Sequence, residues 1–290
     1  MNRRDVIKTG ILASGCLIHP GLSGNIENVK PTNLKGNIRH AVCQWTYDFL
    51  SIDDLCILSK DIGIEAIDLV EPGDWDTVKR HGLTVSMCSG AEIGLTKGWN
   101  DTQYHTSLIQ RYTDYMPGMT KAGFTNLICF SGNRGSIDDE IGLNNCVDGL
   151  SKILPMAEKL GITIHMEILN SKVDHKGYMC DKNSWGIELC KRLDSPNFKL
   201  LFDIYHVQIM EGDIIRNIRQ HAQYYGHYHT AGVPGRNELD QHQELYYPAI
   251  MQAIHQTGFK GYVAQEFMSK FKDTEAKKQS LRDAIYLCDI

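Results

Sequence analysis

The sequence contains no apolar run as long as a membrane-spanning helix requires, which argues against an integral membrane protein of the helical type. It also lacks basic runs and stripes of aromatic and basic residues, and its net charge of -5 does not favour a nucleic-acid partner. No phosphate-binding P-loop and no internal repeat occur. With 42% hydrophobic and 22% charged residues, the composition is that of an ordinary globular protein.

Paired cysteine motifs are absent too, although the chain has nine cysteines. No two of them are arranged as Cys-x-x-Cys, and five lie in strand-like or helix-like apolar runs: Cys43, Cys88, Cys129, Cys190 and Cys288. We therefore expect buried small side chains rather than disulfide bonds or a zinc site built from thiolates.

The first 20 residues have the features of an export signal rather than of a folded domain. Arg3 and Arg4 lie within the segment 2–8, and an apolar stretch follows at 11–18. This arrangement resembles a twin-arginine signal and predicts export to the periplasm. The four residues that end at Cys16 resemble a lipoprotein cleavage box, so a lipid anchor on Cys16 is an alternative form of the exported protein.

The rest of the chain is expected to consist of a polar linker at 21–36 and one domain at 37–290. In this domain, short β-branched or apolar runs alternate with longer amphipathic segments. Eight runs predict strands: 39–46, 64–70, 83–89, 125–131, 162–169, 199–206, 224–230 and 261–267. Six segments predict helices: 51–61, 101–122, 141–160, 212–221, 248–257 and 273–287.

Eight strands that alternate with helices predict an α/β fold, a single (β/α)8 TIM barrel. The alternative is a doubly wound open sheet, which usually has a glycine-rich turn after its first strand. The segment 43–50, at the end of the first run, contains no glycine.

Ionisable residues lie at the ends of four successive runs, where a TIM barrel gathers its functional groups. They are Glu167 in the fifth run, Asp203 in the sixth, His229 in the seventh and Glu266 in the eighth. Three buried carboxylates at one barrel mouth would repel each other unless a cation lay between them. Carboxylates with one imidazole suit a single divalent ion, namely Mn²⁺, Mg²⁺ or Co²⁺, with Zn²⁺ as a further candidate.

Neighbouring polar residues are candidates for contacts with a substrate. His227 and His229 are two positions apart and point the same way on a strand, so one can bind a metal while the other packs or donates a hydrogen bond. His206, three positions after Asp203, is expected to face the substrate. Arg236 follows a Pro-Gly turn and can grip a carboxylate or a pair of hydroxyls, the alternative being an ion pair within its own loop.

Four segments, in this order, resemble the hydroxypyruvate isomerase family: HMEILNSK, FDIYHVQ, GHYHTAGVPGRNELD and GYVAQEF. That family belongs to the xylose isomerase-like TIM barrels, which also include ketose 3-epimerases and apurinic-site endonucleases. The resemblance covers most of the chain from about residue 39 and is densest over 162–267. It implies roles for six residues: metal ligands Glu167, Asp203, His229 and Glu266, with Glu167 and Glu266 as the acid/base pair, and substrate contacts His206 and Arg236.

Two positions depart from the isomerase or epimerase pattern. His229 is more similar to the epimerases, because the isomerases more often have glutamine there. Val173 occupies a position where ketose epimerases have a substrate-binding glutamate. The chain also lacks the additional histidine and acidic ligands that the endonuclease branch needs for several metal ions.

The expected activity is therefore that of a metal-dependent sugar or hydroxy-keto-acid isomerase that works by proton transfer through an enediolate. The alternatives are a ketose 3-epimerase, a periplasmic lyase or hydratase of 3-keto-glycosides, and a non-catalytic carbohydrate-binding barrel. A small carbohydrate or hydroxy-keto acid is the expected partner, without nucleic acid or a membrane span, and the sequence leaves the oligomeric state open.

Overall fold

The predicted strands form a closed barrel in the computed structural model, which describes residues 34–290. The strands are β1 (Arg39–Cys43), β2 (Ala66–Val70), β3 (Thr84–Cys88), β4 (Asn126–Cys129), β5 (Thr163–Glu167), β6 (Phe198–Asp203), β7 (Tyr225–Thr230) and β8 (Tyr262–Gln265). Each pairs in parallel with the next, and β8 closes the barrel on β1. Every predicted run overlaps one of these strands, so the predicted fold class is confirmed.

The predictions for the start of the chain fall outside the described residues. This applies to the export signal at 1–20, to the lipid anchor on Cys16 and to most of the linker at 21–36. The end of the predicted linker is described, and it contacts the C-terminus. The Lys35 backbone N–H donates to Asp289 Oδ1 at 3.0 Å, and Asn37 Nδ2 donates to the Ile290 carbonyl at 2.8 Å.

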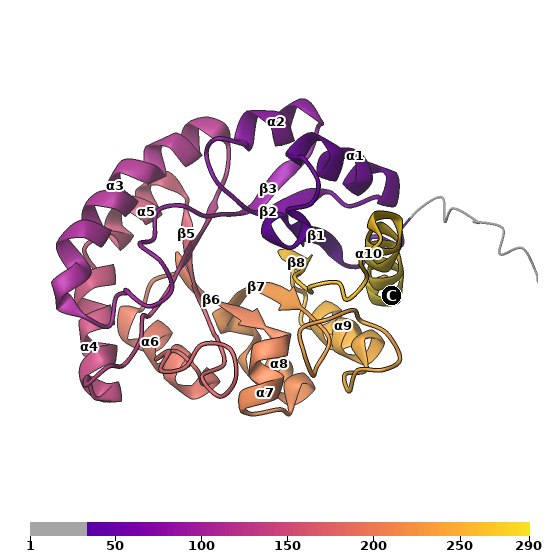
Figure 1. The fold of residues 1–290 in the computed structure, drawn as a ribbon. Coiled ribbons are helices and arrows are strands. Elements are labelled where there is room, and N and C mark those ends of the chain that lie inside the picture. Colours follow the sequence, from indigo (N-terminus) through magenta and orange to yellow (C-terminus); the bar gives the residue numbers. More distant parts are fainter. Residues whose placement is uncertain (1–33) are drawn as a thin grey trace, which may run out of the picture. The chain divides into compact units, whose positions relative to one another are not determined.

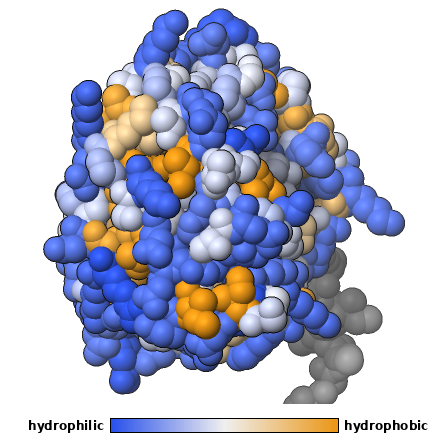
Figure 2. All heavy atoms as spheres, turned by 90° about the vertical axis from the view of Figure 1, so that its left-hand side faces the viewer, coloured by the Kyte–Doolittle hydropathy of each residue, from blue (hydrophilic) through white to orange (hydrophobic). Residues whose placement is uncertain are grey.

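The helices lie outside the strands and form a ring around them (Figure 1). They are α1 (Ile52–Ile62), α2 (Trp75–Arg80), α3 (His105–Ala122), α4 (Asp139–Leu150), α5 (Leu154–Leu160), α6 (Asn183–Leu193), α7 (Ile204–Met210), α8 (Ile214–His221), α9 (Tyr247–Gln256) and α10 (Thr274–Cys288), with 3-10 turns at Gln44–Tyr47, Thr102–Tyr104 and Ala222–Tyr224. The face on the side of α3 and α4 is mostly hydrophilic, with apolar residues in separate small groups (Figure 2). Among residues 34–290, no helix combines the length and hydropathy needed to cross a bilayer.

Helix α1 shows how local sequence signals set the helix boundaries. The Ser51 side chain accepts a hydrogen bond from the Asp54 backbone N–H at 3.1 Å, and acidic residues in the first turn favour the helix dipole. Gly63 ends the helix with a φ of 96°, a conformation that glycine adopts without steric cost. Cap, apolar face and terminating glycine agree, which is why this helix was predictable.

The helix predictions need three corrections. The predicted helix 141–160 is divided into α4 and α5, because Pro155 in the first turn of α5 has no N–H to continue the earlier helix. Helices α2, α6 and α7 were not predicted. The predicted sixth strand 199–206 ends at Asp203, so His206 lies in helix α7 and not at a strand end.

Small side chains inside the barrel make room for polar ones. A separate cluster of buried residues on β1, β2 and β8 consists of Ala41, Cys43, Ala66, Tyr262 and Ala264. On β7, His229 pairs with Ala264 of β8 on one side and with Asp203 of β6 on the other. The eight cysteines in the described part of the chain are all free and buried, including Cys43.

His40 on β1 is buried without a partner, which makes the fold sensitive to acid. Neither of its ring nitrogens has a hydrogen-bond partner. Burial lowers the pKa of His40 from 6.5 to about 4, although the charges of Asp289 and Glu65 act in the opposite direction. The pKa of His40 is lower in the folded state than in the unfolded state. The free energy of unfolding is therefore highest above pH 6.5 and declines as the pH falls towards 4.

We expect His40→Leu to remove part of this acid sensitivity. The 2.5-unit pKa difference between 6.5 and about 4 corresponds to roughly 3 kcal/mol of unfolding free energy lost in the wild type over that pH range. Urea unfolding at pH 7.5 and pH 4.5 should therefore show a smaller pH-dependent decline for the variant. His242→Gln, at an exposed position, is the control and should behave as the wild type. Equal declines in all three proteins would contradict the assignment to His40.

Candidate active site

The four residues singled out as metal ligands meet at one end of the barrel. Glu167 and Asp203 are the last residues of β5 and β6. His229 is the last but one residue of β7, and Glu266 directly follows β8. One ligand atom from each lies within 4.8 Å of the others, and all four side chains are buried. The strand ends therefore bring three carboxylates and one imidazole together.

One carboxylate oxygen of this cluster has no hydrogen-bond partner. Asp203 Oδ1 accepts from the backbone N–H of His206 at 3.1 Å and so caps the start of α7. Asp203 Oδ2 is buried and accepts no hydrogen bond, and Arg236 Nη2 stays 3.8 Å away from it. A buried carboxylate oxygen without a partner is costly, and a bound cation would satisfy it.

The imidazole of His229 lies between two of the carboxylates. Its Nδ1 is 3.2 Å from Glu167 Oε1 and 2.9 Å from Glu266 Oε2. A ring nitrogen carries at most one hydrogen, so it cannot make a full hydrogen bond to both oxygens. With its lone pair directed at the same place, Nδ1 would join the two carboxylates as a cation ligand. The residues present therefore fit a divalent ion that prefers oxygen and imidazole ligands.

Burial and mutual repulsion give the three carboxyl groups different acidities. Burial and the nearby Glu266 charge raise the pKa of Asp203 well above its usual value, and the same two causes raise the pKa of Glu167. Burial acts the same way on Glu266, but the charges of Arg236 and His229 outweigh it and hold its pKa well below the usual range. A divalent cation would favour the ionised form of all three groups.

Arg236 reaches the cluster from the loop after β7. Its Nη2 donates to Glu266 Oε2 at 2.6 Å. Its guanidinium lies 5.1 Å from the ring centroid of Trp45 and 5.7 Å from that of Tyr205. Of the two placements that the sequence left open, Arg236 therefore takes the one at the barrel mouth and not the ion pair within its own loop.

Trp45 borders the cluster on the side of β1. Its Nε1 donates to Glu266 Oε1 at 2.9 Å, so both oxygens of Glu266 have a donor. The Trp45 side chain is nevertheless 42% exposed. A partly exposed indole beside a carboxylate is suited to stack on the apolar face of a sugar.

His206 is held in one tautomer by Asn170, a residue that sequence reasoning missed. Asn170 Oδ1 accepts from the backbone N–H groups of Val173 and Asp174, both at 3.0 Å, which fixes the orientation of the amide. Its Nδ2 then donates to His206 Nδ1 at 2.6 Å. His206 therefore carries its hydrogen on Nε2, which is buried, lacks a partner and lies 3.7 Å from Asp203 Oδ2.

The long loop after β5, residues 169–181, is tied to the barrel. The Tyr178 hydroxyl donates to the Glu167 carbonyl at 3.0 Å. Arg134 Nη2 pairs with Asp181 Oδ1 at 2.9 Å. The His175 ring packs against that of His206 with centroids 5.2 Å apart. The loop therefore forms one wall of the site.

Asp68, from β2, is a second residue that sequence reasoning missed. Its Oδ1 lies 3.0 Å from His229 Nε2, and its Oδ2 lies 2.8 Å from His227 Nε2. Asp68 is fully buried. The sequence does contain a signal for Asp68, because an aspartate inside the apolar run AIDLV is as unusual as Glu167 inside the apolar run 162–169.

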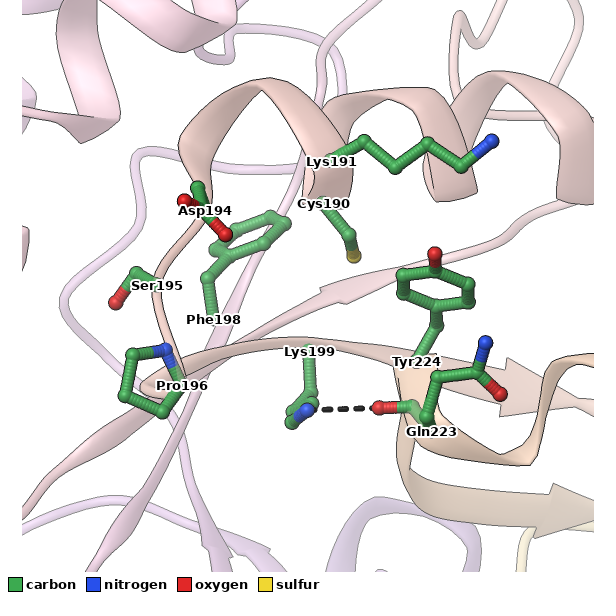
Figure 3. Close-up of a pocket in the computed structure, with 9 residues that line it drawn as sticks. All are labelled: Cys190, Lys191, Asp194, Ser195, Pro196, Phe198, Lys199, Gln223 and Tyr224. Carbon is green, nitrogen blue, oxygen red and sulfur yellow. Dashed lines mark hydrogen bonds between the residues drawn. The ribbon is translucent and has the colours of Figure 1, made fainter.

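A separate hollow lies at the opposite end of β6 from the acidic cluster (Figure 3). It has a volume of about 470 Å³ and is lined by Cys190, Lys191, Asp194, Ser195, Pro196, Phe198, Lys199, Gln223 and Tyr224. Burial raises the pKa of the Cys190 thiol to about 12, so the thiol is neutral at physiological pH. Lys199 Nζ donates to the Gln223 carbonyl at 2.7 Å. The hollow is lined by a single carboxylate, Asp194, and by no histidine, so it offers no set of ligands comparable to the acidic cluster.

Sequence comparison finds relatives among named isomerases. A stretch of 107 residues is 35% identical to the 2-oxo-tetronate isomerase of Cupriavidus necator, covering 37% of this chain and 40% of that protein. A stretch of 105 residues is 32% identical to a Homo sapiens protein that carries the name of a hydroxypyruvate isomerase, covering 36% and 38%. The matches thus span about two fifths of the length of these relatives.

Structure comparison finds the same fold. The crystal structure of an AP endonuclease of family 2 from Brucella melitensis superposes with a TM-score of 0.76 at 22% identity, over 84% of this chain and 96% of that one. The family described as xylose isomerase-like TIM barrel matches residues 75–286, which include all four residues of the acidic cluster. The chain therefore belongs to the xylose isomerase-like TIM barrel family.

Proposed function

We propose that this protein is a divalent-metal-dependent isomerase of a short sugar or hydroxy-keto acid, and that it acts in the periplasm. The convergence of Glu167, Asp203, His229 and Glu266, with one buried oxygen unsatisfied, carries the proposal. The isomerase names of the relatives support the reaction class. Export rests on the sequence of residues 2–8 alone.

In the proposed reaction, a proton moves between two carbons of the substrate next to a carbonyl group. A metal held by the four clustered residues would stabilise the negative charge that develops on the substrate oxygens. One of Glu167 and Glu266 removes a carbon-bound proton, and the electron pair left behind forms the carbon–carbon double bond of an enediolate. The same or the other glutamate returns the proton, to the adjacent carbon for isomerisation or to the opposite face for epimerisation.

The remaining side chains orient the substrate. Arg236 presents a guanidinium beside Glu266, where it can bind a carboxylate or a pair of hydroxyls. His206, with its hydrogen on Nε2, can donate a hydrogen bond to a substrate oxygen but cannot accept a proton there. The roles left for proton transfer therefore fall to the two glutamates.

A second candidate is a lyase that acts on an oxidised glycoside, and exposed apolar residues beside the site favour it. Trp45 is 42%, Met268 44% and Phe271 49% exposed, and all three follow the mouth ends of β1 or β8. The Met268 backbone N–H donates to the Arg236 carbonyl at 2.6 Å, which places it next to the site. The aglycone of a glycoside would add apolar surface for contact with these side chains, which a three-carbon acid lacks.

The test is deuterium uptake from heavy water into a panel of substrates. The panel contains hydroxypyruvate, a 2-oxo-tetronate, a free ketohexose and a 3-keto-glucoside, and each is analysed by mass spectrometry with metal-loaded and EDTA-treated protein. We expect metal-dependent uptake into one panel member. An isomer as product supports the isomerase, and a released aglycone or a new double bond supports the lyase. Loaded protein that exchanges no panel member would contradict the proposal.

A further inference from the structure

Asp68 lies directly behind the His229 imidazole as seen from the acidic cluster. Asp68 Oδ1 is 3.0 Å from His229 Nε2, while His229 Nδ1 faces Glu167 and Glu266. Asp68 comes from β2, across the barrel from β7, and is fully buried together with His229. The two nitrogens of this ring therefore have distinct surroundings, with one carboxylate on one side and two on the other.

The Asp68 side chain is itself held on both oxygens. Its Oδ2 accepts a hydrogen bond from Ser86 Oγ at 2.5 Å and lies 2.8 Å from His227 Nε2. Its Oδ1 also lies within 3.6 Å of Cys43 Sγ. Contacts from three other strands thus fix the carboxylate below the cluster, where it has little freedom to turn away from His229.

A neutral imidazole carries its hydrogen on one nitrogen and a lone pair on the other. A carboxylate next to one nitrogen holds the hydrogen there, directs the lone pair of the other outwards and fixes the plane of the ring. Asp68 contacts Nε2 of His229, so in the neutral ring that can bind a metal the hydrogen lies on Nε2 and the lone pair lies on Nδ1. That lone pair points to the place where Glu167 and Glu266 converge.

We propose that Asp68 is a positioning residue that presets His229 as an Nδ1 ligand for the divalent ion. This inference rests on the metal site of the proposed function and adds a residue that would not touch the ion. The group formed by Cys43, Asp68 and His229 is the competing arrangement, an ion site of its own. The geometry disfavours it, because it offers one carboxylate and a thiol, whereas the cluster at the barrel mouth offers three carboxylates.

The test measures Mn²⁺ affinity by calorimetry on full-length protein stripped with a chelator. We expect Asp68→Asn to weaken the affinity about 10- to 100-fold, the usual effect of losing such a partner. Ser86→Ala is the matched control, because it removes one hydrogen bond to Asp68 but keeps its charge and its contact with His229. We expect this control to bind Mn²⁺ within about threefold of the wild type.

A double variant separates positioning from a general loss of structure. Glutamine in place of His229 offers an amide oxygen and has no tautomer to fix. In the His229→Gln background, Asp68→Asn should therefore change Mn²⁺ affinity less than threefold. If the losses of Mn²⁺ affinity caused by Asp68→Asn and His229→Gln simply add in the double variant, Asp68 acts through the fold and the inference is wrong.

A measurement on the wild type covers the case in which Asp68→Asn does not fold. In protein loaded with ¹¹³Cd²⁺, the ¹⁵N NMR spectrum should show coupling of cadmium to Nδ1 of His229 and a hydrogen on Nε2. Cadmium on Nε2, or two ions per chain in the wild type, would overturn the inference. A wild type that binds no Mn²⁺ would instead refute the metal site of the proposed function.

Discussion

Replacing Glu167 or Glu266 by glutamine is expected to lower the rate of deuterium exchange into the substrate about 10²- to 10⁴-fold, the usual contribution of a general base. Glutamine keeps the size of the side chain and an oxygen that can bind metal, but it cannot take up a proton at neutral pH. Both carboxylates belong to the cluster and contact His229 Nδ1. Each substitution therefore removes one of the two groups that transfer the proton. The measurement is the rate of deuterium exchange into the substrate at saturating substrate concentration. The metal content is determined on the same samples.

Asp203→Asn is the matched control for these two variants. Asp203 belongs to the same buried cluster, yet the proposed mechanism assigns it no proton transfer. Its loss should weaken metal binding, and excess Mn²⁺ should restore most of the exchange. Excess metal should not restore exchange in the glutamate variants. Recovery of all three variants at high Mn²⁺ would mean that the glutamates act only as ligands.

The fold was predictable because strands and helices carry strong local signals. Each of the eight strands overlaps an apolar run, and α1 has its cap and its terminating glycine in the expected places. The errors have local causes as well. Helix α6 was not predicted, because its Trp185, Ile187 and Leu189 are two positions apart, which is not the helical period. His206 was placed at a strand end because its run continues apolar into α7.

The cluster at the barrel mouth was predictable because the fold decides which residues meet. Once eight parallel strands close into a barrel, residues at their carboxyl ends converge, so Glu167 and Glu266 need no other signal. The sequence marks Asp68 as a polar residue inside an apolar strand, but it does not indicate which histidine Asp68 contacts. Asn170 carries no such signal, because neither strand position nor residue spacing encodes its hydrogen bond to one nitrogen of His206.

Removing the metal is expected to lower the thermal stability as well as to abolish exchange. A ligand that binds only the folded state stabilises it by about 4 kcal/mol when its free concentration is about 1,000 times Kd. For a domain of this size, that energy corresponds to a rise in Tm on the order of 10 °C. Calorimetric scans of chelated and Mn²⁺-saturated protein measure the difference. Identical Tm values would show that the cluster does not bind the ion.

Asp203→Asn should raise the melting temperature of the metal-free protein and lower that of the Mn²⁺-saturated protein, each relative to the wild type. Without metal, the wild type holds three carboxyl groups within 4.8 Å, and Asp203 Oδ2 has no partner. Asparagine removes one of these groups, supplies an N–H that can donate to a neighbouring carboxylate, and still caps α7 through its oxygen. The metal-free variant should therefore melt at a higher temperature than the metal-free wild type. With saturating Mn²⁺ the order should invert, because the wild type binds the ion more tightly. Two curves that keep the same order in both states would mean that Asp203 is part of the packing and not a group placed there to bind a cation.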